Sequence, residues 1–338
     1  MKILCAISGG VDSAVAAAIL KKRGHELIGV YLDLFGVQQE EIESARAVAT
    51  KLKIPFYVLN FRDIFQREVI EYFLRTYANG ATPNPCVICN PIIKFGRLLT
   101  KARELNCEKL ATGHFARIHG NKLLRGIDVT KDQSYFLCRL TSRQLSHVIF
   151  PLGKKTKTEV KKLAQNLGFV DQAKKKESSG ICFLEKKDVA DFLAENLPKK
   201  NFQPGPIRIL NGKIVGQHQG LLRYTIGQRR GIKVGGMKEP FFVAGFNRQH
   251  NELLITPDAK LFSQKLQAKK LSFVNEPPKF GEKIFAQIRY RHPATPARIF
   301  PHKTIANLEF EKPQRAITSG QTVVFYRGAT CLGCGEIV

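Results

Sequence analysis

The sequence predicts an α/β fold, a doubly wound parallel sheet, followed by a small β-rich middle domain and a C-terminal β-barrel. In the first half, apolar runs of strand length alternate with amphipathic helical segments, as in a parallel sheet. Beyond about residue 202, short strands separated by glycine-containing turns replace the helical spacing, which is typical of small β structures. We therefore expect three domains, over residues 1–202, 203–265 and 266–338.

Each expected element rests on its own local pattern. Four short apolar runs predict the strands of the parallel sheet, over residues 3–7, 27–32, 56–61 and 109–113. Apolar residues at helical spacing predict helices over residues 12–22, 40–52, 63–77, 92–105, 156–168 and 186–197. Strand-like runs in the C-terminal part predict the barrel, over residues 270–274, 283–292, 304–310 and 322–326.

Two segments interrupt this alternation, and each carries cysteine. Residues 80–91 contain three prolines and a glycine, which predict a loop, and residues 174–183 predict a second loop. Asn211-Gly212 between two apolar runs predicts a hairpin in the middle domain.

The charge of the chain points to a polyanionic partner. Its 338 residues include 54 Lys and Arg against 28 Asp and Glu, a formal net charge of +26. The excess is denser in residues 201–338, which hold 21 basic and 8 acidic residues. Nucleic acid is the simplest partner, and a solvated lysine-rich surface is the alternative. No apolar run approaches the ~20 residues of a membrane span and no signal peptide is evident, so we expect a cytoplasmic protein that does not contact membranes.

A glycine-rich turn follows the first strand and supplies the strongest motif. The string Ser8-Gly9-Gly10-Val11-Asp12-Ser13 lies between a predicted strand and a predicted helix. Two glycines allow close approach of the backbone, and the free N–H groups of a helix N-terminus bind anions. The turn is therefore a phosphate cradle, without the Lys of the Walker loop. Asp12 is a candidate for acid–base or metal chemistry, and its alternative role is the N-cap of the helix.

This string resembles the PP-loop of the ATP pyrophosphatases. The resemblance implies that ATP is cleaved between its α- and β-phosphates, that a substrate oxygen is adenylated, and that Mg²⁺ bridges the phosphates. Further motifs resemble the family of tRNA-specific 2-thiouridylases, in the order of that family and over essentially the whole chain. They are residues 82–90 (TPNPCVICN), 111–114 (ATGH), 131–136 (KDQSYF), 179–183 (SGICF), 216–220 (GQHQG), 225–229 (TIGQR) and 289–291 (RYR).

The resemblance implies ATP-dependent 2-thiolation of the wobble uridine of tRNA, with sulfur supplied by a persulfide donor such as a cysteine desulfurase or a relay protein. It implies that Cys89 is the nucleophile and that Cys182 carries the persulfide. Cys86 stands where many relatives have an acidic residue. Cys86, Cys89 and Cys182 are thus also candidate ligands of a 4Fe–4S cluster, and the sequence leaves persulfide and cluster chemistry open.

The resemblance also implies the residues that bind each substrate, and we expect the protein to act as a monomer. ATP contacts are expected at Ala6, Ile7, Ser8, Gly9, Gly10, Val11, Asp12, Ser13, Leu32 and Gly113. Contacts to tRNA are expected at Asn84, Pro85, Cys86, His114, Asp132, Gln133, Ser134, Arg289, Tyr290 and Gln321. The chain departs from the pattern after Leu32, where relatives usually carry a longer insert.

Two other classes of protein remain as alternatives. An amide-forming PP-loop ligase would not need Cys89 and Cys182, and a non-enzymatic RNA-binding protein would not need an intact phosphate cradle. The paired cysteines disfavour the first class, and the complete SGGVDS string disfavours the second.

Replacing either cysteine separates the two halves of this reaction. We expect Cys89→Ser and Cys182→Ser each to abolish tRNA thiolation while AMP formation survives at least in part, because adenylation needs no thiol. Nucleoside analysis and AMP release measure the two steps. Full thiolation by either variant would contradict the two-cysteine chemistry.

Overall fold

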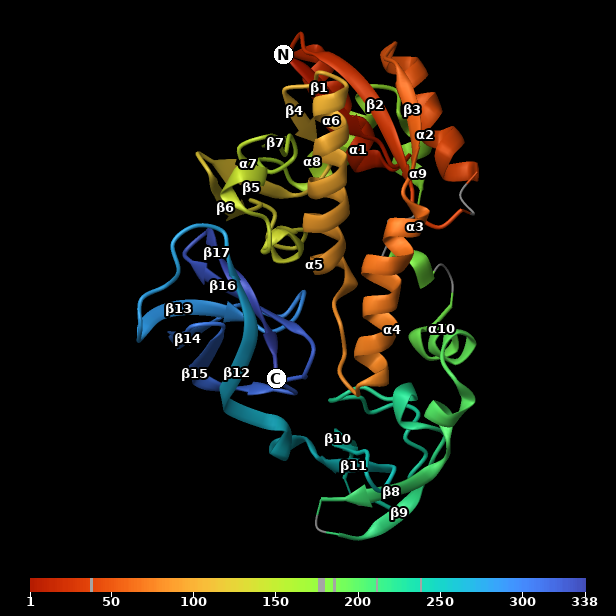
Figure 1. Ribbon diagram of the computed structural model, residues 1–338, viewed down its shortest axis with the longest axis vertical. Helices are drawn as coiled ribbons and strands as arrows, with labels where there is room; N and C mark the ends of the chain where they lie inside the picture. Colours follow the sequence, from red (N-terminus) through yellow and green to blue (C-terminus); the bar gives the residue numbers. More distant parts are fainter. Residues whose placement is uncertain (37–38, 176–179, 185–186, 211, 238) are drawn as a thin grey trace.

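The computed structural model describes residues 1–36, 39–175, 180–184, 187–210, 212–237 and 239–338. It contains a five-stranded sheet, a four-stranded sheet and an eight-stranded sheet. In Figure 1 the five-stranded sheet lies at the top, the four-stranded sheet at the bottom, and the barrel formed by most of the third sheet lies beside the helices that connect them. Within the described parts of the chain, no helix is long and apolar enough to cross a membrane.

The predicted doubly wound parallel sheet is confirmed. Its strand order is β3-β2-β1-β4-β7, and all four pairings are parallel. The strands are β1 (Lys2–Ala6), β2 (Glu26–Asp33), β3 (Phe56–Asn60), β4 (Lys109–Ala111) and β7 (Val148–Ile149). Sequence reasoning missed β7, which has only two residues and therefore no periodic pattern.

Both faces of this sheet are covered, as a parallel sheet requires. Along β1, Ile3 and Cys5 pack into one apolar cluster and Leu4 into another, because successive side chains point to opposite faces. The first cluster contains residues of α1 (Val11–Lys22), α2 (Gln39–Leu52) and α8 (Lys157–Asn166). The second contains residues of α6 (Leu98–Glu104) and, further on, of the barrel.

Two long helical stretches descend from the sheet towards the middle domain (Figure 1). The first consists of α3 (Arg62–Phe65), a π-helical segment (Gln66–Ile70) and α4 (Glu71–Ala78). The second consists of α5 (Pro85–Cys89), a π-helical segment (Asn90–Arg97) and α6. The expected loop over residues 80–91 is therefore wrong in its second half. Pro85 occupies the first turn of α5, where a missing N–H costs no hydrogen bond, so proline there starts a helix and does not break it.

The middle domain is built on a sheet of order β10-β11-β8-β9. Its strands are β8 (Gly205–Ile209), β9 (Ile214–His218), β10 (Phe241–Asn247) and β11 (Glu252–Pro257). Strands β8 and β9 pair antiparallel on either side of the expected hairpin, although Asn211 itself lies outside the described residues. Helices α9 (Val170–Lys174) and α10 (Val189–Asn196) precede this sheet in the chain.

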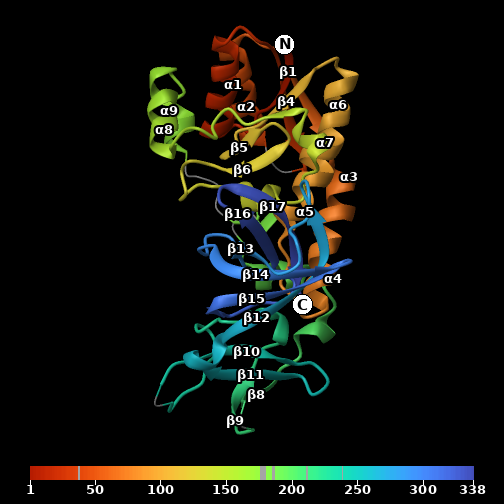
Figure 2. The same ribbon diagram turned by 90° about the vertical axis from the view of Figure 1, so that its left-hand side faces the viewer.

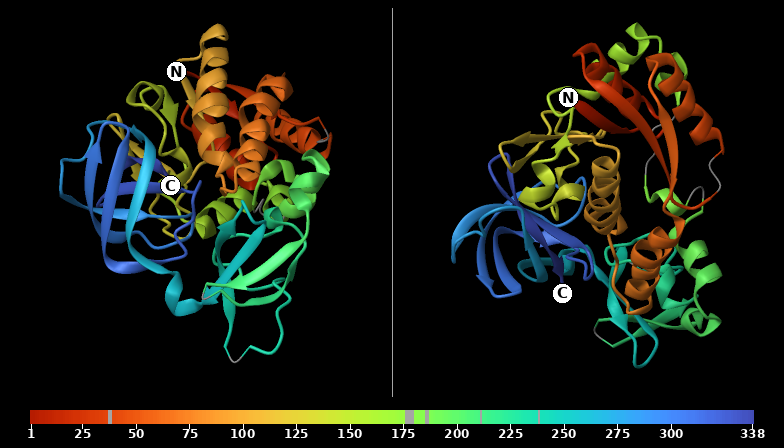
Figure 3. Two further views of the ribbon diagram at one scale, coloured as in Figure 1. Left: turned by 60° about the horizontal axis from the view of Figure 1, so that its bottom comes forward. Right: turned by 45° about the horizontal axis from the view of Figure 1, so that its top comes forward.

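Six C-terminal strands close into the predicted barrel. Their order is β12-β15-β14-β13-β16-β17, and pairing of β12 with β17 completes the circle. The strands are β12 (Phe262–Phe273), β13 (Glu282–Gln287), β14 (Thr295–His302), β15 (Ile305–Arg315), β16 (Thr322–Arg327) and β17 (Thr330–Ile337). Figures 2 and 3 show the middle sheet next to the barrel. The chain passes from the middle sheet into the barrel at β12.

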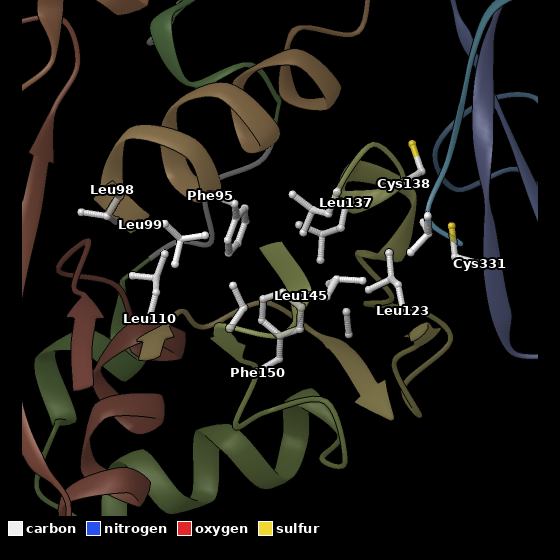
Figure 4. Close-up of a cluster of buried hydrophobic side chains, with 14 of the residues drawn as sticks. Phe95, Leu98, Leu99, Leu110, Leu123, Leu137, Cys138, Leu145, Phe150 and Cys331 are labelled. Carbon is white, nitrogen blue, oxygen red and sulfur yellow. The ribbon is translucent and has the colours of Figure 1, made fainter. Parts of the chain in front are cut away.

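The barrel is joined to the parallel-sheet domain by a shared apolar core. The hairpin of β5 (Ala116–His119) and β6 (Lys122–Arg125) pairs with β17 and so extends the barrel sheet. Cys138 and Leu137 from the connection after β6 lie near Cys331 of β17, as Figure 4 shows. Phe95 and Leu110 continue the same cluster into the parallel-sheet domain.

A glycine in the turn after β7 permits close packing of this junction. A Cβ atom on Gly153 would lie 1.9 Å from the carbonyl oxygen of Ala116. We expect Gly153→Ala to lower the free energy of unfolding by about 3 kcal/mol, because the backbone must shift to relieve the overlap. Denaturant unfolding measures the change. Gly235→Ala is the matched control, since a Cβ there would lie in open space. An equal loss of stability in both variants would contradict the argument.

Candidate active site

The turn after β1 has the geometry of a phosphate cradle. Gly9 has a φ of +76°, and a Cβ there would lie 2.8 Å from the carbonyl oxygen of Glu41. The hydroxyl of Ser13 accepts a hydrogen bond from the backbone N–H of Ser8 at 3.1 Å and donates to the carbonyl of Gly10 at 2.9 Å. These bonds fold the turn tightly over the start of α1, and the free N–H groups of a helix N-terminus are suited to bind an anion.

Asp12 forms an ion pair that the sequence did not reveal. Both of its carboxylate oxygens accept hydrogen bonds from the ammonium of Lys157, each at 2.7 Å. The N-cap interpretation of Asp12 is wrong, because Gly10 occupies the cap position and no side chain bonds to the cap N–H groups. Lys157 is the buried first residue of α8, which begins with a capping box formed by Thr156 and Glu159.

The other expected ATP contacts surround the same turn in different ways. Gly113, after β4, packs so closely that a Cβ would lie 2.8 Å from the backbone carbon of Asp12. Ile7 and Val11 are buried in the core, so they offer the cradle their backbone and not their side chains. Leu32 is half-buried and lies between two apolar clusters near the end of β2. The carboxyl ends of β1, β2 and β4 thus meet at the cradle, as expected for a ligand site in a parallel sheet.

The two cysteine segments pack together, although 93 positions separate Cys89 from Cys182. Cys89 is the last residue of α5 and is buried, and Cys182 is exposed at the start of a single 3₁₀ turn. Phe183 and Leu184, which follow Cys182, belong to the same apolar cluster as Cys89. The rings of Phe183 and of Phe65 and Phe73 are in contact, and Cys182 lies close enough to Cys86 and Cys89 for the charges of their thiolates to interact.

The electrostatics of the site favour protonated thiols. Burial raises the pKa of Cys86 to about 11 and that of Cys89 to about 12, and it also raises the pKa of Cys182. In all three cases the ammonium of Lys94 opposes this rise, and for Cys182 backbone N–H groups oppose it too. Lys94 is half-buried in the π-helical segment after α5. Sequence reasoning overlooked Lys94, although its position five residues after Cys89 in a helical stretch was a usable signal.

The three thiols do not form a metal-binding cluster in this structure. Within the described ranges, no three His, Cys, Asp or Glu side chains converge as a metal ion requires, and this includes Cys86, Cys89 and Cys182. As described, the three side chains are not arranged around one common metal position.

His114 is a neutral side chain next to the same site. Burial, together with a smaller effect of the Lys94 ammonium, lowers its pKa to about 3. Its Nδ1 lies 2.7 Å from the hydroxyl of Thr112, and its ring contacts the rings of Phe95 and Phe150. A neutral imidazole at physiological pH can exchange hydrogen bonds with a base or ribose but cannot neutralise a phosphate.

The expected RNA-binding residues of the KDQSYF motif hold the junction with the barrel. Asp132 accepts hydrogen bonds from the N–H of Gly126 and from Ser134, and the Gln133 side chain accepts one from Phe115. Ser134 is fully buried, and its hydroxyl lies 3.1 Å from that of Tyr326. These contacts give the three residues a structural role, and their contact with RNA stays a prediction.

The remaining candidates lie where the cysteine segment meets the barrel. Arg289 and Tyr290 are half-buried after β13, and the Tyr290 ring lies 4.3 Å from that of Phe136. Gln321 precedes β16, and its amide donates to the carbonyl of Thr82 at 3.1 Å. Asn84 and Pro85 begin α5. The structure therefore gathers most expected RNA contacts around one junction.

A PP-loop-like phosphate cradle and a pair of neighbouring cysteines in one chain define a nucleotide-using enzyme of the thiol-transfer type. Models of three families match the chain: the tRNA methyl transferase HUP domain over residues 1–186, the tRNA methyl transferase PRC-barrel domain over 190–257, and the aminomethyltransferase beta-barrel domain over 263–337. The chain is 44% identical to the tRNA-specific 2-thiouridylase MnmA of Heliobacterium modesticaldum over 99% of its length and 92% of that protein. It is 42% identical to the enzyme of the same name from Moorella thermoacetica, covering 99% of this chain and 98% of the other. The chain belongs to the family of tRNA-specific 2-thiouridylases.

Solved structures resemble the chain more distantly. A U34-tRNA thiolase from Methanococcus maripaludis, described with its [4Fe-4S] cluster, aligns over 59% of this chain and 68% of its own, with 24% identity and a TM-score of 0.37. A 4-thiouridine synthetase in complex with RNA and bound ATP aligns over 59% and 50%, with 18% identity and a TM-score of 0.38. Likenesses of this size do not bear on the chemistry of the site.

Removing the charge of Lys94 tests the electrostatics of the thiols. A raised pKa means that alkylation of Cys182 by iodoacetamide increases with pH until the thiolate dominates. We expect Lys94→Met to shift this profile upwards by about 0.5 to 1 pH unit, because a cation that favours the thiolate is lost. Peptide mass spectrometry measures the rate at Cys182. Lys94→Arg keeps the charge and serves as the control, and an unshifted Met profile would contradict the assigned role.

Proposed function

We propose that the protein is a tRNA-uridine 2-sulfurtransferase. It adenylates the wobble uridine of tRNA with ATP and then replaces the 2-oxygen with sulfur, giving 2-thiouridine, AMP and pyrophosphate. The approach of Cys182 to Cys89 at one apolar cluster carries this proposal, because it brings together two cysteines that are distant in sequence. Membership of the 2-thiouridylase family supports it.

The cradle formed by residues 8–13 binds the phosphates of ATP. Its backbone N–H groups face the anion, and Lys157 supplies a buried cation at the same place. Mg²⁺, when bound, neutralises phosphate charge, and the carboxylate of Asp12 is the side chain of this motif that would hold it. Lys157 pairs with Asp12 at this place and would neutralise phosphate charge beside it when the nucleotide is bound.

The cysteines supply the sulfur. A persulfide donor loads Cys182, whose exposed position suits transfer from another protein. The terminal sulfur attacks C2 of the adenylated uracil, and AMP leaves with the former 2-oxygen. Cys89 then attacks the Sγ of Cys182, so that a Cys89–Cys182 disulfide forms and the sulfur remains on the base. Two electrons from an external thiol reductant restore both thiols. This route uses no iron–sulfur cluster, and within the described residues Cys86, Cys89 and Cys182 do not converge on one metal position.

The RNA approaches the junction of the cysteine segment and the barrel. Arg289 and Tyr290 provide a cation and an aromatic ring there, a combination suited to phosphate contact and base stacking. Bases of the anticodon loop leave their stack easily, so the target uridine can be extruded into the site. The neutral His114 contacts the extruded uridine there. We propose that the three domains are residues 1–202, 203–265 and 266–338. We also propose that the chain acts as a monomer in the cytoplasm.

Reconstitution with purified components tests the proposal. With ATP, Mg²⁺, unmodified tRNA and a persulfide donor, we expect 2-thiouridine at the wobble position together with stoichiometric AMP, measured by nucleoside mass spectrometry. Asp12→Ala should reduce AMP formation by about a hundredfold or more, because the metal ligand and the Lys157 partner are lost together. The control Asp63→Ala removes an exposed carboxylate of α3, outside residues 8–13. Thiolation that continues without ATP, or undiminished AMP formation by Asp12→Ala, would contradict the proposal.

A further inference from the structure

A turn of the barrel is hydrogen-bonded to the backbone just before Cys86. We call residues 82–86 the cysteine loop. The N–H of Thr82 donates to the carbonyl of Ser319 at 2.8 Å, and the Thr82 carbonyl accepts from the side chain of Gln321 at 3.1 Å. Gly320 has a φ of +84°, and a Cβ there would lie 2.8 Å from the nitrogen of Thr82. Both polar backbone groups of Thr82 are thus held by one barrel turn, and only glycine allows so close an approach.

A buried phenol makes a second link between the same two segments. The hydroxyl of Tyr135 donates to the carbonyl of Thr322 at 2.6 Å, and the Asn84 side chain lies beside the same hydroxyl. Tyr135 is 1% exposed. Burial raises the pKa of this phenol well above its ordinary value, so the hydroxyl stays protonated and continues to donate.

The cysteine loop is stiff enough to transmit this position. Pro83 and Pro85 lie between Thr82 and Cys86, and each proline fixes its own φ and restricts the residue before it. Pro85 opens α5, whose last residue is Cys89. Fixing Thr82 and Asn84 relative to the barrel therefore fixes the start of the helix that carries both Cys86 and Cys89.

The same barrel carries the residues expected to contact RNA. The ring of Tyr290 lies 4.3 Å from that of Phe136 and 6.0 Å from that of Tyr135. Figure 1 shows the barrel beside the start of α5, with the parallel sheet on the far side of that helix. An RNA held on the barrel would consequently share one rigid frame with the cysteines, while ATP is held by a different part of the protein.

We propose that residues 319–322 of the barrel, together with Tyr135, form a positioning element that sets the cysteine loop relative to the barrel-bound RNA. This inference rests on the proposed function and adds that the barrel aligns the sulfur chemistry as well as contributing to the binding surface. Tyr135 is a positioning residue, since its hydroxyl touches the loop and the barrel turn and not the reacting atoms.

Tyr135→Phe tests the positioning element in the full-length enzyme. We expect the kcat of thiolation to fall between about ten- and a hundredfold, because a small misplacement of reacting groups costs this much. The KM for tRNA, its Kd and the rate of AMP formation should stay within twofold of the unchanged protein, since the RNA surface and the cradle are intact. Alkylation of Cys86 by iodoacetamide should become faster as the loop loosens.

Tyr326→Phe is the matched control. It removes the hydroxyl of another fully buried tyrosine at the same barrel junction. That hydroxyl bonds to Ser134 and not to the barrel turn that holds the loop. We expect the kcat of this variant to equal that of the unchanged protein. An equal loss of kcat in both variants would overturn the proposal, because any weakening of the junction would then suffice.

Gln321→Ala provides a second route should Tyr135→Phe fold poorly. Gln321 is only half-buried, and its replacement removes one of the two hydrogen bonds between the barrel turn and Thr82. A fall in kcat at constant KM supports positioning, whereas a rise in KM at constant kcat overturns it in favour of a contact with RNA alone. If the unchanged protein fails to thiolate tRNA, the proposed function itself fails, and this outcome is distinct from active variants that show no change in kcat.

Discussion

The parallel-sheet domain and the barrel share one apolar core, and the geometry of the site depends on that contact. Leu4 and Val30 of the sheet belong to the same buried cluster as Val324 and Cys334 of the barrel. Burial of apolar surface stabilises such a contact by roughly 25 cal/mol per Å² and has no preferred direction. The hydrogen bond from Tyr135 to the barrel turn then selects one orientation within the apolar contact.

Once this orientation is fixed, two sites with opposite electrostatic needs can lie next to each other. The cradle needs positive potential for the phosphates of ATP, and N–H groups of α1 together with Lys157 supply it. The cysteines need a dry environment, because water would hydrolyse an adenylated base. Burial provides dryness around Cys89 but raises the pKa of its thiol, and Lys94 offsets part of that rise. The site therefore combines one buried and one exposed thiol with a cation close to both sulfur atoms.

Sequence reasoning was most successful where the pattern is local. Four of the five parallel strands followed from apolar runs, and only the two-residue β7 was too short to detect. Residues 80–91 were expected to be a loop because prolines usually break helices, yet Pro85 starts one. The π-helical segments were not foreseeable, because a π turn differs from an α turn only in its hydrogen-bond spacing, and no residue pattern marks it.

By itself the sequence determined the chemistry available: the SGGVDS cradle, the two cysteine segments and the family to which the chain belongs. These follow from residue type and spacing, which are local properties. Only the tertiary structure decided which residues act together. Lys157 reaches Asp12 across 145 positions, Thr322 reaches Tyr135 across 187, and Gln321 reaches Thr82 across 239. Such contacts arise because distant elements are buried against one another, and no local pattern along the chain encodes that pairing.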